Sequence, residues 1–483
     1  MYSTASKIKT AIWWIRRDLR LTDNQALAAA IAAAEQVIPL FIVDPFFENS
    51  DYVGDKRRAF LWTGLRQLDV DLRQRGSRLV VRFGRPQQIL TQLIAESGAE
   101  AIFAEEDFTS YARRRDQQIA QTLPLTLTAG VVVHPPGTVL KPDGDPYIVF
   151  TPFKKKAWLE RPLPKPSDIL PAPNKINTPD DTNSQEIPAK PELPEGVPFK
   201  PGEAEAQRRL QAFAQDAIDQ YAQDRDMVAL DGTSQLSPYL RFGMISARQA
   251  VVTAVSCHDN APDKDARKGA DTWLSELIWR EFYVHIMYHF PHVLERSFRP
   301  EYDEIVWRNR EKEFEAWGNG RTGYPLVDAA MRQLATSGWM HNRARMIVAS
   351  FLVKDLLIDW RWGEKFFLQH LVDGDPAANN GGWQWTAGTG TDAAPYFRIF
   401  NPISQSKKFD PRGEFIRRWV PELANVPNDY IHEPWLMPPL VQKSANCRIG
   451  SEYPAPIVDH AEARDWTLAA YKNAREADPR QDA

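Results

Sequence analysis

A proline-rich segment at residues 161–202 divides the chain into two parts of different character. The segment, RPLPKPSDILPAPNKINTPDDTNSQEIPAKPELPEGVPFKPG, has few aromatic residues and no apolar periodicity. Such a composition is typical of an extended connector rather than of a packed element. At 483 residues the chain is also longer than one hydrophobic core usually supports. We therefore expect two domains joined by a linker.

The part before the linker alternates β-type runs with helical patterns. Buried strands are expected at residues 11–15, 37–43, 78–83, 101–104 and 131–133. Helical spacing of apolar residues is seen at 24–35, 56–75, 86–97 and 111–122. This order predicts an α/β domain with a doubly wound parallel sheet, whose ligands bind at the carboxyl ends of the strands. We place this domain at residues 1–135 and the linker at 136–202.

The first expected strand is followed by the charged run RRDLR, which contains Arg16, Arg17, Asp18 and Arg20. No G-x-G-x-x-G or Walker motif follows any expected strand, so neither phosphate-binding fingerprint supports a nucleotide site there. A solvated, salt-bridged loop is sufficient to explain the charges.

The part after the linker reads as almost all-α. Helices are predicted at 203–223, 246–255, 271–288, 326–337, 343–357 and 363–371, with Gly and Pro clusters between them. We assign residues 203–475 to this helical domain. It holds twelve of the sixteen Trp residues, which fits either a Trp-rich core or a site for a flat ligand.

Bulk properties exclude several classes. The net charge of -4 argues against a protein that coats nucleic acid non-specifically, although it allows a local basic face. The longest apolar runs are too short to span a bilayer, and the N-terminus lacks a signal-peptide pattern. Cys257 and Cys447 suggest neither a disulfide framework nor a metal site. We expect a cytoplasmic monomer that has no membrane partner.

Residues 373–385, DGDPAANNGGWQW, combine carboxylates, amides, a Gly pair and two Trp. Gly and Asn interrupt regular structure, so this stretch is predicted to be a loop that wraps a large planar ligand. Upstream, the hydroxyl-rich turn TSQLS at 233–237 could hold a phosphate with backbone N–H groups. An ordinary helix start at Ser237 with Pro238 explains the same turn.

The helix WLSELIWREFYVHIMYHF places Trp273, Glu276 and Arg280 on one face, beside Trp279. An acid, a base and two large aromatics on neighbouring turns suit stacking and edge recognition of flat rings. Further along, Glu281, His285 and His289 follow at steps of four, a spacing that permits metal binding. Because the pattern lacks the open coordination position of a zinc protease, we expect no metal.

Long motifs carry a family resemblance. TGYPLVDAAMRQL, GWMHNRARMIVASFLVKDLLIDW and DGDPAANNGGWQWTAGTGTDAAPYFRIFNP resemble the cryptochrome/photolyase family, specifically the class I cyclobutane pyrimidine dimer photolyases of bacteria. The RRDLR run, the turn at 233–237 and the WxxELIWREFY helix also match, in the same order. The resemblance covers nearly the whole chain except the linker and the last residues.

The resemblance implies a flavoenzyme whose helical domain holds FAD, active as FADH⁻. Its phosphates would be held by Tyr221, Thr233, Ser234, Gln235, Leu236 and Ser237. Trp273 and Arg280 would line the region between flavin and substrate. Asp373, Gly374 and Asp375 would contact the flavin portion, and Asn379 would face flavin N5. An amide there can exchange a proton where a carboxylate would oppose reduction.

The implied activity is light-driven repair of cyclobutane pyrimidine dimers, a carbon-carbon lyase reaction. Excited FADH⁻ would give an electron to a dimer flipped out of UV-damaged DNA, the ring would split, and the electron would return. Matching residues for dimer and DNA binding are Arg225, Glu276, Trp279, Asn342, Arg343, Met346, Trp385 and Gln405. Of these, Glu276, Asn342 and Met346 are assigned catalytic roles, together with Asn379.

Two further features follow from the resemblance. Trp383, Trp360 and Trp307 match the electron relay from flavin to surface. Photolyases of the (6-4) lesion carry two His where this chain has Asn342 and Met346, so cyclobutane dimers are the expected substrate. Trp385 favours duplex DNA over the single-strand preference of DASH-type relatives, although single strands would also bind.

Two parts of the chain depart from the pattern of relatives: residues 373–385, and the pocket that would bind an antenna pigment in the α/β domain. Pro376 stands where relatives commonly carry Leu, and proline removes a backbone N–H. Tyr111 and Ala112 replace the Asn-Glu pair of folate-binding relatives. Arg57 and Asp107 match a deazaflavin pocket, with Arg241 at a Lys position. The expected antenna is 8-hydroxy-5-deazaflavin; methenyltetrahydrofolate and a flavin are alternatives. A cryptochrome-like blue-light photosensor is the alternative function.

Overall fold

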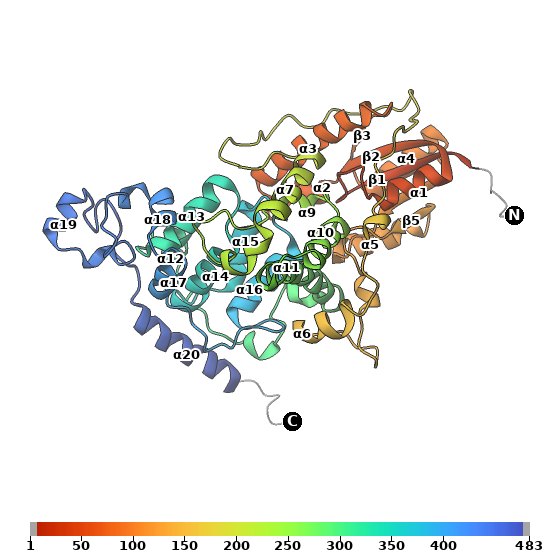
Figure 1. Ribbon diagram of the computed structural model, residues 1–483. Coiled ribbons are helices and arrows are strands. Elements are labelled where there is room, and N and C mark those ends of the chain that lie inside the picture. Colours follow the sequence, from red (N-terminus) through yellow and green to blue (C-terminus); the bar gives the residue numbers. More distant parts are fainter. Residues whose placement is uncertain (1–6, 477–483) are drawn as a thin grey trace. The chain divides into compact units, whose positions relative to one another are not determined.

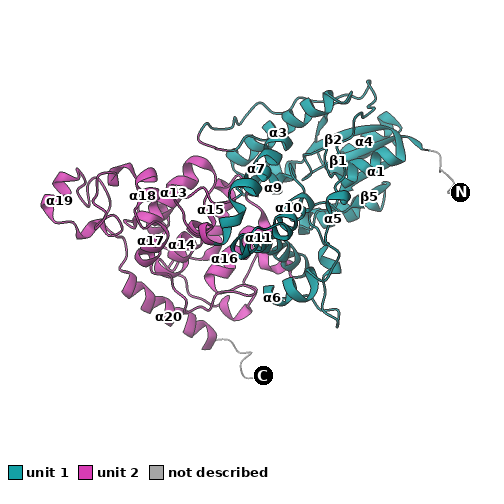
Figure 2. Cartoon of the chain, in the orientation of Figure 1, with its two compact units in different colours: residues 1–195, 199–222, 234–289 teal, residues 196–198, 223–233, 290–483 magenta. Residues whose placement is uncertain are grey.

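The computed structural model describes residues 7–476 and forms two compact units. Unit 1 contains residues up to 195, 199–222 and 234–289, and unit 2 contains 196–198, 223–233 and the chain from 290 (Figure 2). Thus helices that follow the linker share a unit with the sheet. The predicted boundaries at 135 and 202 do not follow this division, and they stay a prediction.

Unit 1 contains a five-stranded, wholly parallel sheet in the order β3-β2-β1-β4-β5 (Figure 1). The strands are β1 (Ile8–Ile15), β2 (Ala34–Val43), β3 (Val80–Phe83), β4 (Ala101–Glu105) and β5 (Leu125–Thr128). Ala11 pairs with Val37 on one side and with Ala101 on the other, so β1 lies at the centre. The doubly wound fold is confirmed, because the strand order reverses between β1 and β4.

The fifth strand is not where the sequence predicted it. Residues 131–133 are not a strand, and the alternating LTLT of β5 pairs with β4 instead. The backbone of 131–133 is held by side chains of α11 (Lys264–His289): Val131 O accepts from Arg280 Nη1 at 2.9 Å, and Val133 N donates to Glu281 Oε1 at 2.5 Å. This valine run does not extend the sheet, because its backbone groups already form hydrogen bonds with side chains of α11.

Helices cover both faces of the sheet. Leu90, Leu93 and Ile119 share a buried apolar cluster with the strands, which puts α4 and α5 on one face, and right-handed crossovers place α1 and α3 on the other. The helices of unit 1, in addition to α11, are α1 (Gln25–Ala33), α2 (Pro45–Glu48), α3 (Asp55–Arg73), α4 (Pro86–Ser97), α5 (Ser110–Ala120), α6 (Phe150–Phe153), α7 (Glu203–Asp216), α9 (Ser237–Phe242) and α10 (Ala247–Asp259). The short α8 (Tyr221–Asp224) crosses from one unit to the other.

The proline-rich linker is bound to the sheet. Gln185 N donates to Val81 O at 2.9 Å, and Val37 N donates to Asn177 O at 2.8 Å. Ser184 Oγ accepts from Val81 N at 2.9 Å, so the linker satisfies backbone groups of β3. An exposed strand edge would otherwise be free to pair with another chain.

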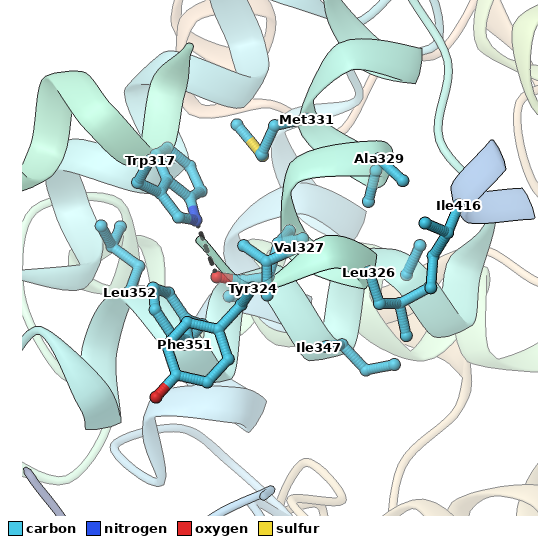
Figure 3. Close-up of a cluster of buried hydrophobic side chains, with 14 of the residues drawn as sticks. Trp317, Tyr324, Leu326, Val327, Ala329, Met331, Ile347, Phe351, Leu352 and Ile416 are labelled. Atoms are coloured by element: carbon cyan, nitrogen blue, oxygen red, sulfur yellow. Dashed lines mark hydrogen bonds between the residues drawn. The ribbon is translucent and has the colours of Figure 1, made fainter. Parts of the chain in front are cut away.

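Unit 2 is helical. Its helices are α12 (Glu311–Gly318), α13 (Pro325–Ser337), α14 (Asn342–Ser350), α15 (Trp360–His370), α16 (Pro376–Ala387), α17 (Pro402–Phe409), α18 (Glu414–Trp419), α19 (Pro439–Ser444) and α20 (His460–Glu476). Between α14 and α15, a π-helical turn spans Phe351–Asp355. The hydrophobic core of unit 2 includes Trp317, Leu326, Val327 and Phe351 (Figure 3). In this core, Trp317 Nε1 donates a hydrogen bond to Val348 O at 3.0 Å.

The stretch at 373–385 corrects a second prediction. It is not a loop, because α16 begins at Pro376 and ends at Ala387. Asp375 caps the helix by accepting hydrogen bonds from Ala377 N and Ala378 N. Pro376 occupies the first helical position, where a backbone N–H has no partner within the helix, so its missing donor costs nothing there.

Candidate cofactor and nucleic-acid site

Helix α11 presents the unit 1 residues that the sequence singled out. Trp273 is buried, whereas Glu276, Trp279 and Arg280 are half-buried. Trp273 packs against Phe213 with ring centroids 5.0 Å apart, and Tyr221 meets the same phenyl ring edge-on at 5.6 Å. The structure therefore brings the predicted cofactor residues Tyr221 and Trp273 to one aromatic cluster.

The turn at 233–237 ends where α9 begins, at Ser237. Gln235 has a left-handed backbone (φ 49°), and its side-chain oxygen accepts from Arg209 Nη1 at 3.1 Å. Pro238 lies in the first turn of α9, as the simpler explanation predicted, but the N-cap residue is Leu236 and not Ser237. Ser237 is instead the first residue of the helix.

In unit 2, the carboxylate of Asp373 is buried and only half satisfied. Its Oδ2 accepts from Arg345 Nη2 at 2.8 Å. Its Oδ1 is buried and has no hydrogen-bond partner among residues 7–476. Buried polar atoms are normally paired, so Asp373 is poised to accept from a bound group.

Asn379 lies on α16, opposite α15. Its Nδ2 donates to the backbone oxygen of Glu364 at 3.0 Å. The Glu364 side chain is buried, and burial raises the pKa of this carboxyl to about 7 despite a hydrogen bond with Asn379. Sequence reasoning missed Glu364; an acidic residue inside an apolar stretch of helix was the available signal.

Helix α14 carries Asn342 and Met346 one turn apart, and it packs against α16, which carries Trp385. The buried imidazole of His341 caps α14 by accepting from Arg343 N at 3.1 Å. The same Arg343 pairs with Asp226 at 2.8 Å and lies over the Phe409 ring at 4.5 Å. The predicted phosphate ligand Arg343 is thus held by a carboxylate.

The other two predicted phosphate-backbone contacts, Arg225 and Gln405, also belong to unit 2. Arg225 lies 3.9 Å from the carboxylate of Asp226, and Gln405 lies on α17. Lys407, on the same helix, pairs with Glu433. These basic groups gather around carboxylates rather than forming a uniformly positive face.

The three indoles predicted to form an electron relay lie in unit 2, with Trp383 and Trp360 buried and Trp307 half-buried. A Cβ at Gly363 would come within 2.1 Å of the Trp383 ring, so only glycine lets α15, which begins at Trp360, pack this closely on α16. Trp307 meets the Tyr471 ring edge-on at 6.2 Å. Nε1 of Trp383 is buried without a hydrogen-bond partner in the described chain.

The carboxyl ends of β1 and β4 form the switch point where doubly wound sheets bind ligands. Ion pairs fill this position: Arg16 with Asp116 at 2.5 Å, Arg17 with Asp107 at 3.7 Å, and Arg20 with Glu105 at 2.5 Å. The RRDLR loop is therefore salt-bridged, as the simpler explanation predicted. It is buried, however, and not solvated.

The antenna candidates lie in unit 1. Arg57 is buried, and its guanidinium donates to Tyr52 O. Burial opposes ionisation of Asp107, but Arg17 and the Thr109 N–H lower its pKa. Tyr111 stacks on Phe46 at 3.8 Å and donates to Asp44. Tyr111, at the first position of the expected Asn-Glu pair, is thus engaged with other side chains of unit 1.

In the spaced acid–histidine pattern of α11, Glu281 and His285 are buried in the core. The Glu281 carboxylate accepts from Val133 N, His134 N and Trp158 Nε1. Burial lowers the pKa of His285 to about 4, which makes it a neutral core residue. Within residues 7–476, no group of three His, Cys, Asp or Glu side chains is placed to hold a metal. The same residues include no helix long and apolar enough to cross a bilayer.

These residues fit a bound flavin nucleotide. Asp373 Oδ1, just before α16, and Trp383 Nε1, on α16 itself together with Asn379, are buried polar atoms that have no hydrogen-bond partner among residues 7–476. A ligand with its own donors and acceptors would satisfy such atoms.

Known proteins match both parts of the chain. Residues 11–173 match the family described as DNA photolyase, and residues 273–473 match the FAD binding domain of DNA photolyase. A Synechococcus protein named deoxyribodipyrimidine photo-lyase is 43% identical, over 96% of this chain and 97% of its own length. The crystal structure of a class III photolyase from Agrobacterium tumefaciens is 38% identical, with a TM-score of 0.91 over 99% of this chain and 100% of its own.

A cryptochrome from Synechocystis sp. is also similar. It is 30% identical, with a TM-score of 0.86 over 96% of this chain and 100% of its own. The resemblance read from the sequence motifs is thereby confirmed. By these matches, the chain belongs to the DNA photolyase family and carries that family's FAD-binding domain.

Proposed function

We propose that this protein uses light to split cyclobutane pyrimidine dimers in DNA. The observation that carries the proposal is the start of α14, where Asn342 and Met346 lie one turn apart. Relatives that repair the (6-4) lesion carry two proton-donating His at these positions. An amide and a thioether cannot act as such acids near neutral pH, but they can bind an uncharged dimer.

In unit 1, Glu276 would accept or donate hydrogen bonds at the edge of the dimer, and Trp279 would cover part of its apolar face. Both side chains are half-buried on α11, which leaves them accessible to a ligand. In unit 2, Asn342 would bind the dimer edge, whereas Met346 and Trp385 would contact apolar surface. Arg225, Arg343 and Gln405 would hold phosphates and position the strand without reading its sequence.

The cofactor contacts are proposed for residues of both units. Tyr221 and the turn at 233–237 would hold the phosphates of FAD, whereas Trp273 and Arg280 would line the region between flavin and substrate. Asp373, Gly374 and Asp375 would hold its flavin portion, and the Asn379 amide would lie at N5. When bound and reduced, FAD supplies the photoexcited electron that the chain itself cannot. Trp383, Trp360 and Trp307 would carry reducing equivalents inward from the surface.

For the antenna we propose 8-hydroxy-5-deazaflavin, near Arg57 and Asp107. The absence of the Asn-Glu pair at Tyr111 and Ala112 supports this choice, and the Tyr111 side chain is already engaged with Phe46 and Asp44. A deazaflavin absorbs at longer wavelength than a folate, so the spectrum of the purified protein distinguishes the two.

Illumination of the purified protein with thymine-dimer DNA tests the function. We expect loss of dimers under blue light and none in the dark. Glu276→Ala should lower the repair yield while FAD stays bound. Bound, reduced FAD without light-dependent repair would overturn the proposal and favour a photosensor like the similar cryptochrome. An unchanged yield in Glu276→Ala would remove only that residue from the mechanism.

A further inference from the structure

Trp279 is held by an aromatic neighbour that the sequence motifs do not point to. The ring of Phe150 lies 3.7 Å from the Trp279 ring, centroid to centroid, with the planes 8° apart. At this distance and angle the two rings overlap face to face, so one face of the indole is covered. The two residues are far apart in sequence but both belong to unit 1.

A third ring fixes the stacked pair. Phe282 is fully buried and meets Phe150 at 5.8 Å and 73°, and Trp279 at 5.5 Å and 80°. Edge-to-face contacts of this kind are favourable and directional. The indole therefore cannot change its tilt without breaking contacts with both phenyl rings.

The segment that carries Phe150 is itself anchored to α11. Lys154 Nζ donates to Ser275 Oγ at 2.6 Å, and Trp158 Nε1 donates to Glu281 Oε2 at 2.7 Å. These two bonds fasten the residues that follow Phe150 along the helix that carries Trp279. Phe150 is thus part of a fixed frame and not of a loose loop.

Just before Phe150 the chain emerges into solvent. Ile148 and Val149 are 41% and 40% exposed, whereas Phe150 is 8% exposed. The two residues that precede the stacked ring are therefore both apolar and exposed. Exposed β-branched residues beside a half-buried indole fit contact with an apolar or stacked group better than contact with phosphate.

We propose that Phe150 is a positioning residue for dimer recognition: it stacks on Trp279 and holds the indole in the orientation that receives the dimer. The inference rests on the proposed function, in which Trp279 contacts the dimer. Phe150 itself would not touch the reacting atoms. A pre-oriented aromatic surface strengthens binding because less freedom is lost when the ligand arrives.

The test compares variants of the FAD-containing protein. Phe150→Leu keeps an apolar side chain but removes the stack, and we expect about threefold to tenfold weaker binding to an oligonucleotide with one thymine dimer. Phe150→Tyr keeps the stack and should restore wild-type binding. The matched control is Phe153→Leu in the same short helix, because Phe153 packs on Phe282 and His285 instead. It should lower the Tm without weakening dimer binding.

A double-mutant cycle separates positioning from general packing. In a Trp279→Leu background, adding Phe150→Leu should cause no further loss of affinity, because Phe150 acts through the indole. The inference would be overturned if Phe150→Leu caused the same loss of dimer affinity in the wild-type and the Trp279→Leu backgrounds. It would also be overturned if Phe153→Leu weakened dimer binding as much as Phe150→Leu does. Wild-type affinity in Phe150→Leu would overturn it as well. If the wild-type protein itself neither prefers nor repairs dimer DNA, the proposed function fails, which is a distinguishable result.

Discussion

At the scale of single residues, the candidate site combines side chains with unmet bonding capacity and side chains with shifted acidity. Asp373 keeps one buried oxygen that has no hydrogen-bond partner among residues 7–476. Glu364, which the motifs do not mark, shares a hydrogen bond with Asn379 and has its pKa raised to about 7. Burial is the common cause, because it removes the water that would otherwise satisfy or ionise these groups.

The acidity of Glu364 predicts a pH-dependent stability. Its pKa of about 7 in the folded protein exceeds the ordinary value of 4.5, so the folded state holds the proton more tightly. The resulting stabilisation is complete below about pH 4 and is lost as pH rises through about 7, a change on the order of 3 kcal/mol. When thermal unfolding is measured from pH 5 to 8, the Tm of Glu364→Gln should rise relative to that of the wild-type protein as the pH increases. If the plots of Tm against pH were parallel for the two proteins, the raised pKa of Glu364 would be contradicted.

The position of Trp307 predicts a separation of two activities. Trp307→Phe should slow light-driven reduction of oxidised FAD by at least about tenfold, because Phe is much harder to oxidise than Trp. Repair by chemically pre-reduced protein should stay unchanged, because the proposed relay would act only in restoring the reduced state. Trp466→Phe is the control, since this exposed indole packs under Arg308. Equal photoreduction in both variants would exclude Trp307 from the relay.

At the scale of elements, α16 shows how tertiary contacts override weak helix propensity. Two adjacent Gly and two adjacent Asn disfavour a helix in isolation. Asn380 Nδ2 and Gln384 Nε2 both donate to Val293 O, at 2.8 and 2.9 Å, and fasten the helix along one side. The ends are defined by Asp375 and by Gly388, whose left-handed backbone terminates the helix.

The two ends of α16 should tolerate substitution differently. Pro376→Ala should change the free energy of unfolding by less than about 1 kcal/mol, because position 376 needs no backbone donor. Gly388→Ala should cost about 1–2 kcal/mol, since its φ of 81° strains any Cβ and the added atom would meet Ala394 O at 3.1 Å. Denaturant unfolding with FAD retention as a second readout checks both. The reverse order of costs would contradict this placement.

At the scale of the whole molecule, charge balance matters more than total charge. The net charge is -4, yet DNA binding requires positive contacts. The candidate contact Arg343 is neutralised by Asp226 in the protein alone. A phosphate bound at Arg343 would therefore compete with an internal carboxylate.

This competition predicts a gain of affinity by substitution. Asp226→Asn should bind DNA about twofold to fivefold more tightly at low salt, because Arg343 no longer has to leave an ion pair. The gain should shrink as salt screens both interactions. Asp303→Asn is a matched control, since it removes the same charge from the Arg361 pair. Equal gains in both variants, measured by fluorescence anisotropy, would indicate a general charge effect instead.

The sequence alone determined the fold class, the family and the set of candidate residues, because apolar periodicity and long motifs are local properties. The residue pair Asp375–Pro376 even carried a helix-start signal, but the Gly and Asn residues after it obscured that signal. Only the tertiary structure decided that most of residues 373–385 form a helix and that residues 131–133 do not join the sheet. It also decided that Phe150 stacks on Trp279. Each of these depends on partners distant in sequence, whose contacts supply the free energy that local propensity lacks.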